Sequence, residues 1–146
     1  MALRFIETDI EIDAPAQEVW EILRDLSRWP EWHPFVISVV GDLTVGSRLR
    51  LVKGSGERSI SVGQKVAVVD PGTEFRLVGK LGLRGLLDNE HRFRVEPTDG
   101  DKCRFFHGQV FRGWLVRVLI RRKDEASYEV FEEINKALKE WAEVEQ

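Results

Sequence analysis

The sequence predicts an α+β fold in which a strongly curved antiparallel sheet of seven strands wraps around one long C-terminal helix. Two observations support this prediction. Residues 114–146 contain no glycine or proline and are rich in good helix formers, whereas the chain before them is typical of short strands separated by turn residues. Because the 146 residues contain no repeat, low-complexity tract or linker, we expect a single domain over residues 1–146.

The C-terminal stretch carries an apolar stripe on one helical face. The apolar residues recur at three- and four-residue steps: Tyr128, Phe131, Ile134, Leu138 and Trp141. The pairs Glu132 with Lys136 and Lys139 with Glu143 place opposite charges four residues apart on the other, solvated face. A charge run at 121–125 separates the stripe from the apolar residues 114–120, so we expect a kink there.

The N-terminal part predicts one strand followed by two short helices. Isoleucine and threonine alternate with acidic residues from Ile6 to Ile12, which is the pattern of a half-buried strand ending at Asp13. Asp13 or Ala14 then caps a helix with Pro15 in its first turn, and this helix buries Val19, Trp20 and Leu23. Ser27 caps a second, shorter turn, and two tryptophans and two prolines within 29–34 form a stiff corner.

Six further strands are expected before the long helix. We place them at residues 35–40, 47–53, 60–70, 73–81, 86–96 and 102–112. The turns at 70–73 and 97–101 and the flexible tip at 53–56 are short, and short connections join antiparallel neighbours.

Composition limits the class of function. The net charge of −3 argues against nucleic acid as the main partner, because binding to phosphates needs a basic surface. Cys103 is the only cysteine and has no internal partner, and residues 1–12 contain no continuous apolar signal core. No run approaches the roughly 18 apolar residues of a membrane span. We therefore expect a cytoplasmic protein without stable membrane insertion.

Strand parity brings four polar side chains onto one inward face of the last hairpin. If residues 97–101 form the turn, a symmetric register pairs His91 with His107 and Asn89 with Gln109, among apolar neighbours. Buried polar groups need partners, so these side chains bond one another, hold water or meet a ligand. Two interpretations stay open: histidines that are hydrogen-bonded parts of the core, or histidines that contact a ligand.

Other candidates for chemistry are weaker. We interpret His33 as a structural cap at the corner. His33, His91, His107 and Cys103 lack the close spacing of zinc sites, so we expect no metal and no cofactor. Cys103 belongs to an inward apolar row, where burial makes a thiol inert.

Two segments allow alternative interpretations. The glycines and leucines of residues 79–87 suggest a movable lip at a cavity mouth, or leucines that pack on the long helix. The basic residues 121–123 are either a solvated face or a site for an acidic partner or lipid surface.

The order of elements resembles a known superfamily. The resemblance rests on the segments IDAPAQEVW at 12–20, WPEWHP at 29–34 and FEEINKALK at 131–139. These are similar to the helix-grip or SRPBCC superfamily of START, birch-pollen-allergen and polyketide cyclase/dehydrase-like proteins, over essentially the whole chain. The resemblance implies a deep apolar cavity between sheet and long helix, and it offers no catalytic motif to carry over.

Three classes of function follow from this resemblance. The first is a protein that binds a small hydrophobic molecule, whether lipid-, polyketide- or isoprenoid-like. We expect the following side chains to bind it: Trp32, His33, Phe75, Leu77, Asn89, His91, Phe93, Phe105, His107, Gln109, Phe111, Tyr128, Phe131 and Asn135. The second is a polyketide cyclase or dehydratase in which His91 or His107 is the acid/base. The third is a protein-interaction module, as in co-chaperone-like and ribosome- or quinone-associated members of the superfamily.

Overall fold

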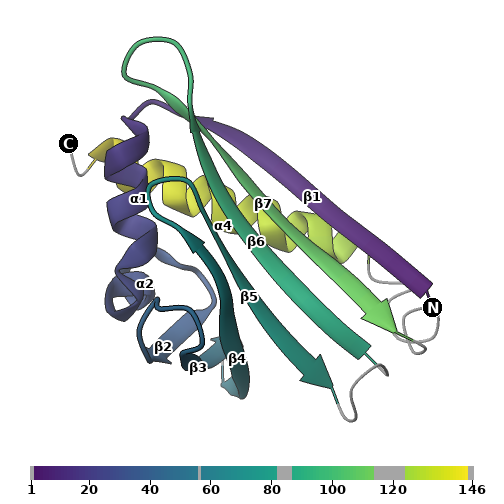
Figure 1. The fold of residues 1–146 in the computed structure, drawn as a ribbon. Helices are drawn as coiled ribbons and strands as arrows, with labels where there is room; N and C mark the ends of the chain where they lie inside the picture. The colour runs from purple at the N-terminus through teal and green to yellow at the C-terminus, as the bar shows by residue number, and fades with distance from the viewer. Residues whose placement is uncertain (1, 56, 82–86, 114–123, 145–146) are drawn as a thin grey trace.

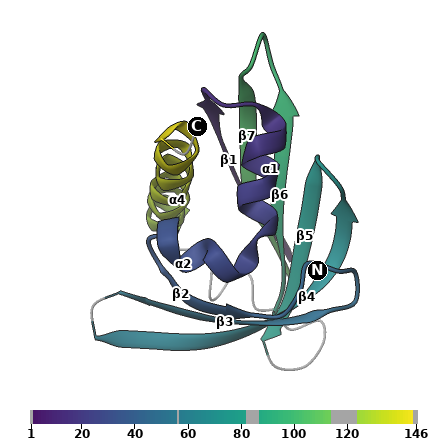
Figure 2. The same cartoon turned by 90° about the vertical axis from the view of Figure 1, so that its left-hand side faces the viewer.

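The computed structural model describes residues 2–55, 57–81, 87–113 and 124–144. Seven antiparallel strands form one sheet in the order β1-β7-β6-β5-β4-β3-β2. The strands are β1 (Ala2–Ile12), β2 (Val36–Val40), β3 (Arg48–Ser55), β4 (Arg58–Asp70), β5 (Glu74–Leu81), β6 (Leu87–Pro97) and β7 (Cys103–Gly113). The sheet bends around the helix α4 (Asp124–Val144), as Figures 1 and 2 show. The predicted fold class is confirmed.

The turns follow from the residues that the sequence places in them. Thr73 N donates to Asp70 O at 3.0 Å, and Gly72 has a φ of 82°, which a residue with a side chain rarely adopts. The turn between β6 and β7 is closed by a bond from Thr98 N to Lys102 O, with Gly100 at a φ of 66°. Both turns therefore join antiparallel neighbours, as predicted.

The register of the last hairpin differs from the symmetric one predicted. His91 lies opposite Gln109, Phe93 opposite His107 and Asn89 opposite Phe111. The predicted pairs of His91 with His107 and Asn89 with Gln109 are therefore wrong by two residues. The reason is the turn, because the last pair is Pro97 with Cys103 and the loop is centred on Gly100 rather than on Asp99. A shift of two residues keeps His91 and His107 on the same face.

Three short helical elements follow β1 and cover one part of the sheet. They are α1 (Ala16–Arg24), the 3-10 turn η1 (Leu26–Arg28) and α2 (Trp29–Trp32). Val19, Trp20 and Leu23 are buried as predicted. Pro15, however, is the residue before the first helical one, and no side chain caps either α1 or η1, so the predicted caps at Asp13 or Ala14 and at Ser27 are wrong.

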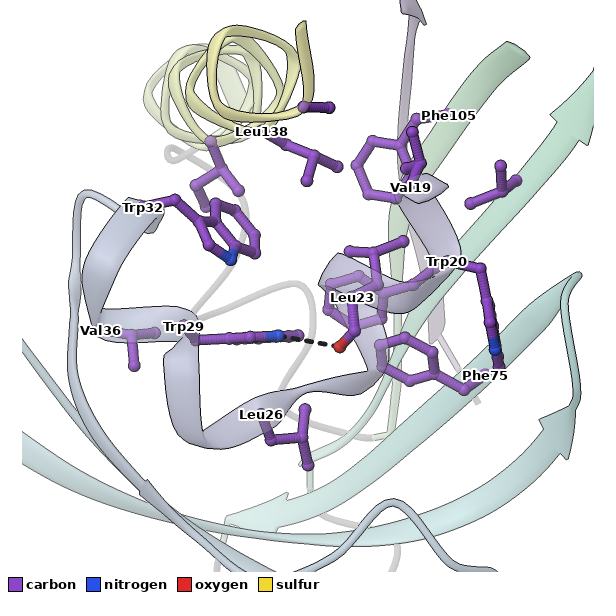
Figure 3. Close-up of a cluster of buried hydrophobic side chains, with 14 of the residues drawn as sticks. Val19, Trp20, Leu23, Leu26, Trp29, Trp32, Val36, Phe75, Phe105 and Leu138 are labelled. Carbon is purple, nitrogen blue, oxygen red and sulfur yellow. Dashed lines mark hydrogen bonds between the residues drawn. The ribbon is translucent and has the colours of Figure 1, made fainter. Parts of the chain in front are cut away.

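A tryptophan joins these helices to the core. The Trp29 indole Nε1 donates to Leu23 O at 2.9 Å, so its one polar atom is satisfied while the ring is buried. Figure 3 shows Trp29 between Leu26 and Trp32, with Phe75 from β5 on the other side of Leu23. Trp29 and Trp32 of the predicted corner at 29–34 are thus part of the core.

Helix α4 lies against the concave side of the sheet (Figure 2). Phe131, Ile134 and Leu138 of the predicted stripe are buried, whereas Tyr128 is 38% exposed. The Lys139 ammonium donates to Glu11 O of β1 at 3.0 Å and pairs with Glu143. Residues 114–123, the predicted kink there and much of the predicted lip at 79–87 lie outside the described residues.

Candidate functional site

A chain of polar side chains, three of them buried and one half-buried, crosses the interior between sheet and helix. It joins four elements: Thr8 of β1, His107 of β7, His91 of β6 and Asn135 of α4. His107 and Asn135 are 0% and 1% exposed, and His91 is 7% exposed. Thr8 lies directly opposite His107 in the register of β1 and β7. Asn135 joins the chain because α4 packs over β1 and β7, whereas Thr8, His107 and His91 meet through the pairing of neighbouring strands.

The backbone fixes the direction of every hydrogen bond in this chain. Thr8 Oγ1 donates to the carbonyl oxygen of His107 at 2.8 Å, since a carbonyl can only accept. The same hydroxyl accepts from Asn135 Nδ2 at 2.8 Å, which leaves Asn135 Oδ1 facing His107 Nδ1 at 2.9 Å. His107 Nδ1 therefore carries a proton.

The same reasoning identifies the donor and the acceptor of the hydrogen bond between the two histidines. The two Nε2 atoms of His91 and His107 lie 2.6 Å apart. In neutral His107 a proton on Nδ1 leaves Nε2 as an acceptor, so His91 Nε2 is the donor. The remaining lone pair of neutral His91 is then on Nδ1, for which no hydrogen-bond partner occurs among the described residues.

Both histidines are held neutral. Burial lowers the pKa of His107 to about 4 and that of His91 well below its ordinary value. The Lys53 ammonium lowers both pKa values further. The rings stack against Phe131, whose centroid lies 5.4 Å from that of His91 and 4.4 Å from that of His107. The arrangement thus presents an unprotonated imidazole in apolar surroundings.

An interior cavity of about 140 Å³ adjoins His91. It lies between the sheet and α4, and residues from eight elements or their flanks line it. They are Trp29, His33, Phe35, Val36, Leu51, Lys53, Gln64, Leu77, His91, Phe93, Gln109, Val130, Phe131 and Ile134. The cavity is therefore mainly apolar with a few polar groups, which is the usual character of a site for a small molecule.

His33 has a structural bond and also lines this cavity. Its Nδ1 accepts from the backbone N–H of Phe35 and of Val36, at 3.1 and 3.2 Å. Burial lowers the pKa of His33 to about 3, so the neutral ring carries its proton on Nε2. The ring stacks on Trp29 with 5.7 Å between centroids. The bonds to the backbone agree with the predicted capping role.

Sequence reasoning missed two polar residues of the cavity, Lys53 and Gln64. Lys53 continues the inward alternation of Leu49 and Leu51 along β3, and Gln64 precedes buried Val66 on β4 at the same parity. This alternation in the sequence could have predicted that both side chains point inward. Burial lowers the pKa of Lys53, and Gln64 Oε1 is buried without a partner in the described part of the chain.

The structure divides the predicted ligand-binding residues into three groups. Those that line the cavity are His33, Leu77, His91, Phe93, Gln109 and Phe131. Those buried in the core or in the hydrogen-bond chain are Trp32, Phe75, Phe105, His107 and Asn135. The others lie elsewhere: Asn89 lines a different groove, Phe111 packs half-buried against the core, and Tyr128 is exposed.

The groove that contains Asn89 is larger, at about 650 Å³. Most of its lining side chains, such as Arg50, Lys65 and Arg112, alternate with buried ones, which places it on the sheet face opposite α4. Neither histidine of the buried pair lines it. We therefore take the smaller interior cavity as the candidate site, because the buried titratable groups lie there.

Metal binding and thiol chemistry find no support in the described residues. No group of three or more histidine, cysteine, aspartate or glutamate side chains is arranged to hold a metal ion in the parts of the chain that are described. Burial raises the pKa of the Cys103 thiol to about 11, which keeps it protonated. In the same described ranges no helix is long and apolar enough to cross a membrane. A cytoplasmic location stays a prediction.

The fold defines a class of α+β proteins with a cavity between the sheet and the terminal helix. The family described as polyketide cyclase / dehydrase and lipid transport matches residues 5–139. The chain belongs to this family, and the predicted SRPBCC membership is confirmed. The sequence has no match among the curated proteins compared.

Solved structures share the fold at low sequence identity. A START superfamily protein from Mycobacterium smegmatis is 20% identical, with a TM-score of 0.79 over 97% of this chain and 99% of that one. An aromatase/cyclase, ZhuI, from a Streptomyces species is 16% identical, with a TM-score of 0.69 over 97% and 94% of the two chains.

The di-domain ARO/CYC StfQ of the steffimycin biosynthetic pathway is 11% identical, with a TM-score of 0.77 over 98% of this chain. This chain spans 51% of the length of StfQ. Identities this low show a shared fold alone.

Proposed function

We propose that the protein binds a small, mostly apolar molecule in the interior cavity, with the polar end of the molecule facing His91. The observation that carries this proposal is the directed hydrogen-bond chain from the carbonyl of His107 to His91, which leaves one lone pair, on His91 Nδ1, without a partner among the described residues. A donor on the ligand would complete the chain. A cavity of about 140 Å³ is large enough for a single aromatic ring, since an engineered cavity of about 150 Å³ holds benzene.

Ligand-dependent melting tests this proposal. Protein purified from a heterologous host should retain a small molecule detectable by mass spectrometry, and adding this molecule back to stripped protein should raise the melting temperature by mass action. Replacing His91 by Leu should remove most of that rise. Replacing Tyr128 by Leu is the control, because Tyr128 is 38% exposed and does not line the cavity. A ligand-induced rise that survives His91→Leu would contradict the proposal.

A second candidate, a cyclase or dehydratase, is favoured by the neutral state of His91. An unprotonated imidazole beside an apolar cavity can take an acidic proton next to a carbonyl, as a general base does. In that step the proton goes to Nδ1, the electron pair of the C–H bond forms the C=C bond of an enolate, and the π pair of the carbonyl moves to its oxygen, which a donor in the cavity would hold. His107, bonded to Asn135, would act as a positioning residue for His91.

Kinetics separates the enzyme from the carrier. With a poly-β-keto thioester as substrate, the His91→Gln variant should bind with little change, because glutamine keeps a donor for His107 and an acceptor for the cavity. Its turnover should fall about 100- to 10,000-fold, the loss expected without a general base. If the unaltered protein binds the thioester but does not turn it over, the enzymatic function is contradicted and the binding function stands. The interaction module stays a prediction without a structural observation in its favour.

A further inference from the structure

Lys53 lies where the interior cavity meets the surface. Its strand neighbours on the same face, Leu49 and Leu51, are each 2% exposed, so the sheet points this lysine inward rather than toward solvent. A groove of about 240 Å³ on the adjoining surface is lined by Gly54, Arg58, Ser59 and Ile60, and Phe35 and Lys53 line both it and the cavity. The lysine therefore borders both the cavity and the groove.

This cation has no negative partner in the described structure. No aspartate or glutamate is among the described residues that line the cavity or the groove, and no ion pair to Lys53 forms within the described ranges. Arg58 adds a second positive charge in the groove. Burial alone lowers the pKa of Lys53, with no nearby carboxylate to oppose it. A partly buried ammonium without a counter-charge is costly, and a bound anion would remove that cost.

A second observation in the same cavity also indicates a polar ligand group. Gln64 is 7% exposed and its buried Oε1 has no partner among the described residues. Its strand, β4, pairs with the strand of Lys53, and both side chains line the cavity. Buried carboxamides in folded proteins are normally hydrogen-bonded. Lys53 lies opposite Ile60 and Gln64 opposite Leu49, so the two side chains line the cavity at separate points of the β3–β4 ladder. Because Gln64 Oε1 can only accept, it indicates a hydrogen-bond donor on the ligand, beside the negative charge that Lys53 would bind.

We propose that the cavity takes an amphipathic molecule with one acidic oxygen, a carboxylate, phenolate or enolate, which the Lys53 ammonium neutralises at the cavity mouth. The apolar body of the molecule packs between Phe93 of the sheet and Phe131 of α4, both of which line the interior. This inference rests on the proposed function and narrows its ligand class from apolar molecules in general to amphipathic acids.

Two probes of equal size test the charge requirement, 3-phenylpropanoate and 3-phenylpropanamide. Each is titrated into the protein at pH 7.5 while amide shifts are followed by NMR. We expect the unaltered protein to bind the carboxylate about 10-fold or more tightly than the amide, as for a charge-assisted hydrogen bond. Lys53→Met should reduce the ratio to about 1, and Lys53→Arg should preserve the preference for the acid.

Lys65→Met is the matched control, because Lys65 is exposed, lies on β4 and lines the opposite groove. It should leave both affinities unchanged. If both probes bind equally well, or Lys53→Met keeps the preference for the acid, the inference is overturned and the apolar binding function stands. If neither probe shifts cavity residues such as Phe93 at millimolar concentration, the proposed function fails and this inference fails with it.

Discussion

Two groups of polar side chains adjoin the interior cavity, and they differ in how their atoms are partnered. In the chain of Thr8, Asn135, His107 and His91, each link is a hydrogen bond of 2.6 to 2.9 Å. Among the cavity-lining residues of β3 and β4, Gln64 Oε1 has no partner and Lys53 has no carboxylate within the described part of the chain.

The difference separates polar groups that stabilise the fold from polar groups that await a ligand. A buried donor or acceptor that loses its partner costs about 1 to 3 kcal/mol, so the bonded chain should be sensitive to truncation. An unpartnered buried group already has that cost in the folded state, so replacing it by an apolar one should be neutral or favourable. The two groups are thus expected to respond to mutation with opposite signs.

The largest effect should come from the apolar packing that holds both groups in place. Leu138→Ala should lower the free energy of unfolding by about 2 to 5 kcal/mol, because Leu138 is fully buried between α4 and the sheet. Urea denaturation measures this. Val144→Ala, at a position 82% exposed, is the control and should change little. A loss under about 1 kcal/mol at Leu138 would mean that α4 is not held by this contact.

The hydrogen-bonded group is tested by comparing two asparagines. Asn135→Ala should lower the free energy of unfolding by about 1 to 3 kcal/mol, because it leaves His107 Nδ1–H without an acceptor. Asn89→Ala should change it by less than about 0.5 kcal/mol, because the buried Oδ1 of Asn89 has no partner among the described residues. If urea denaturation shows equal losses of unfolding free energy for the two variants, the proposed difference between the two groups is contradicted.

The histidines predict a pH dependence whose sign follows from linkage. Their pKa values are lowered on folding, to about 4 for His107 and about 3 for His33. Below pH 6.5 the unfolded chain therefore binds protons that the folded protein does not, and stability falls as the pH falls. Between pH 6.5 and 5, above the range where most carboxylates titrate, the loss should approach about 1 kcal/mol per pH unit for each histidine.

Urea midpoints at pH 7.5, 6.5 and 5.5 measure this slope, and NMR of the Cε1–H signals follows the three histidines one by one. Lys53→Met should raise all three pKa values, since the Lys53 charge lowers each of them. Histidines that titrate near pH 6.5 in the folded protein would show that the rings are hydrated.

The smallest expected effect is on the unpartnered side. Lys53→Met should leave the free energy of unfolding at pH 7.5 unchanged or raise it by up to about 1 kcal/mol, since an apolar side chain of similar length replaces a poorly solvated charge. Thermal and urea melting in the absence of ligand measure it, with Lys65→Met as the exposed reference. A loss of 2 kcal/mol or more would assign Lys53 to the stabilising group.

Local pattern was enough to predict the fold and part of the site. The alternation along β6 and β7 placed His91 and His107 on one face, because successive strand residues point to opposite sides whatever the register. The helical spacing of Phe131, Ile134 and Leu138 predicted the buried face of α4 for the same kind of reason. Each of these inferences needs only the geometry of one element.

Which atoms meet was decided by the tertiary structure. The turn set a register two residues away from the symmetric one, so that the two histidines meet diagonally rather than face to face. Asn135 reaches His107 across 28 residues and Thr8 across 127. Which strand residues become hydrogen-bond partners of Asn135 depends on how α4 crosses the sheet. The spacing of side chains within α4 does not specify that crossing.

The sequence by itself determined the order of elements, the inward faces of the strands and the apolar face of the last helix, because periodicity within an element reports which side is buried. Only the tertiary structure decided that His91 keeps an unpartnered nitrogen and that Lys53, 38 residues away on β3, lines the same cavity without a carboxylate beside it. The physical reason is that burial can be predicted from one strand, whereas satisfaction of a buried polar atom depends on every element packed around it.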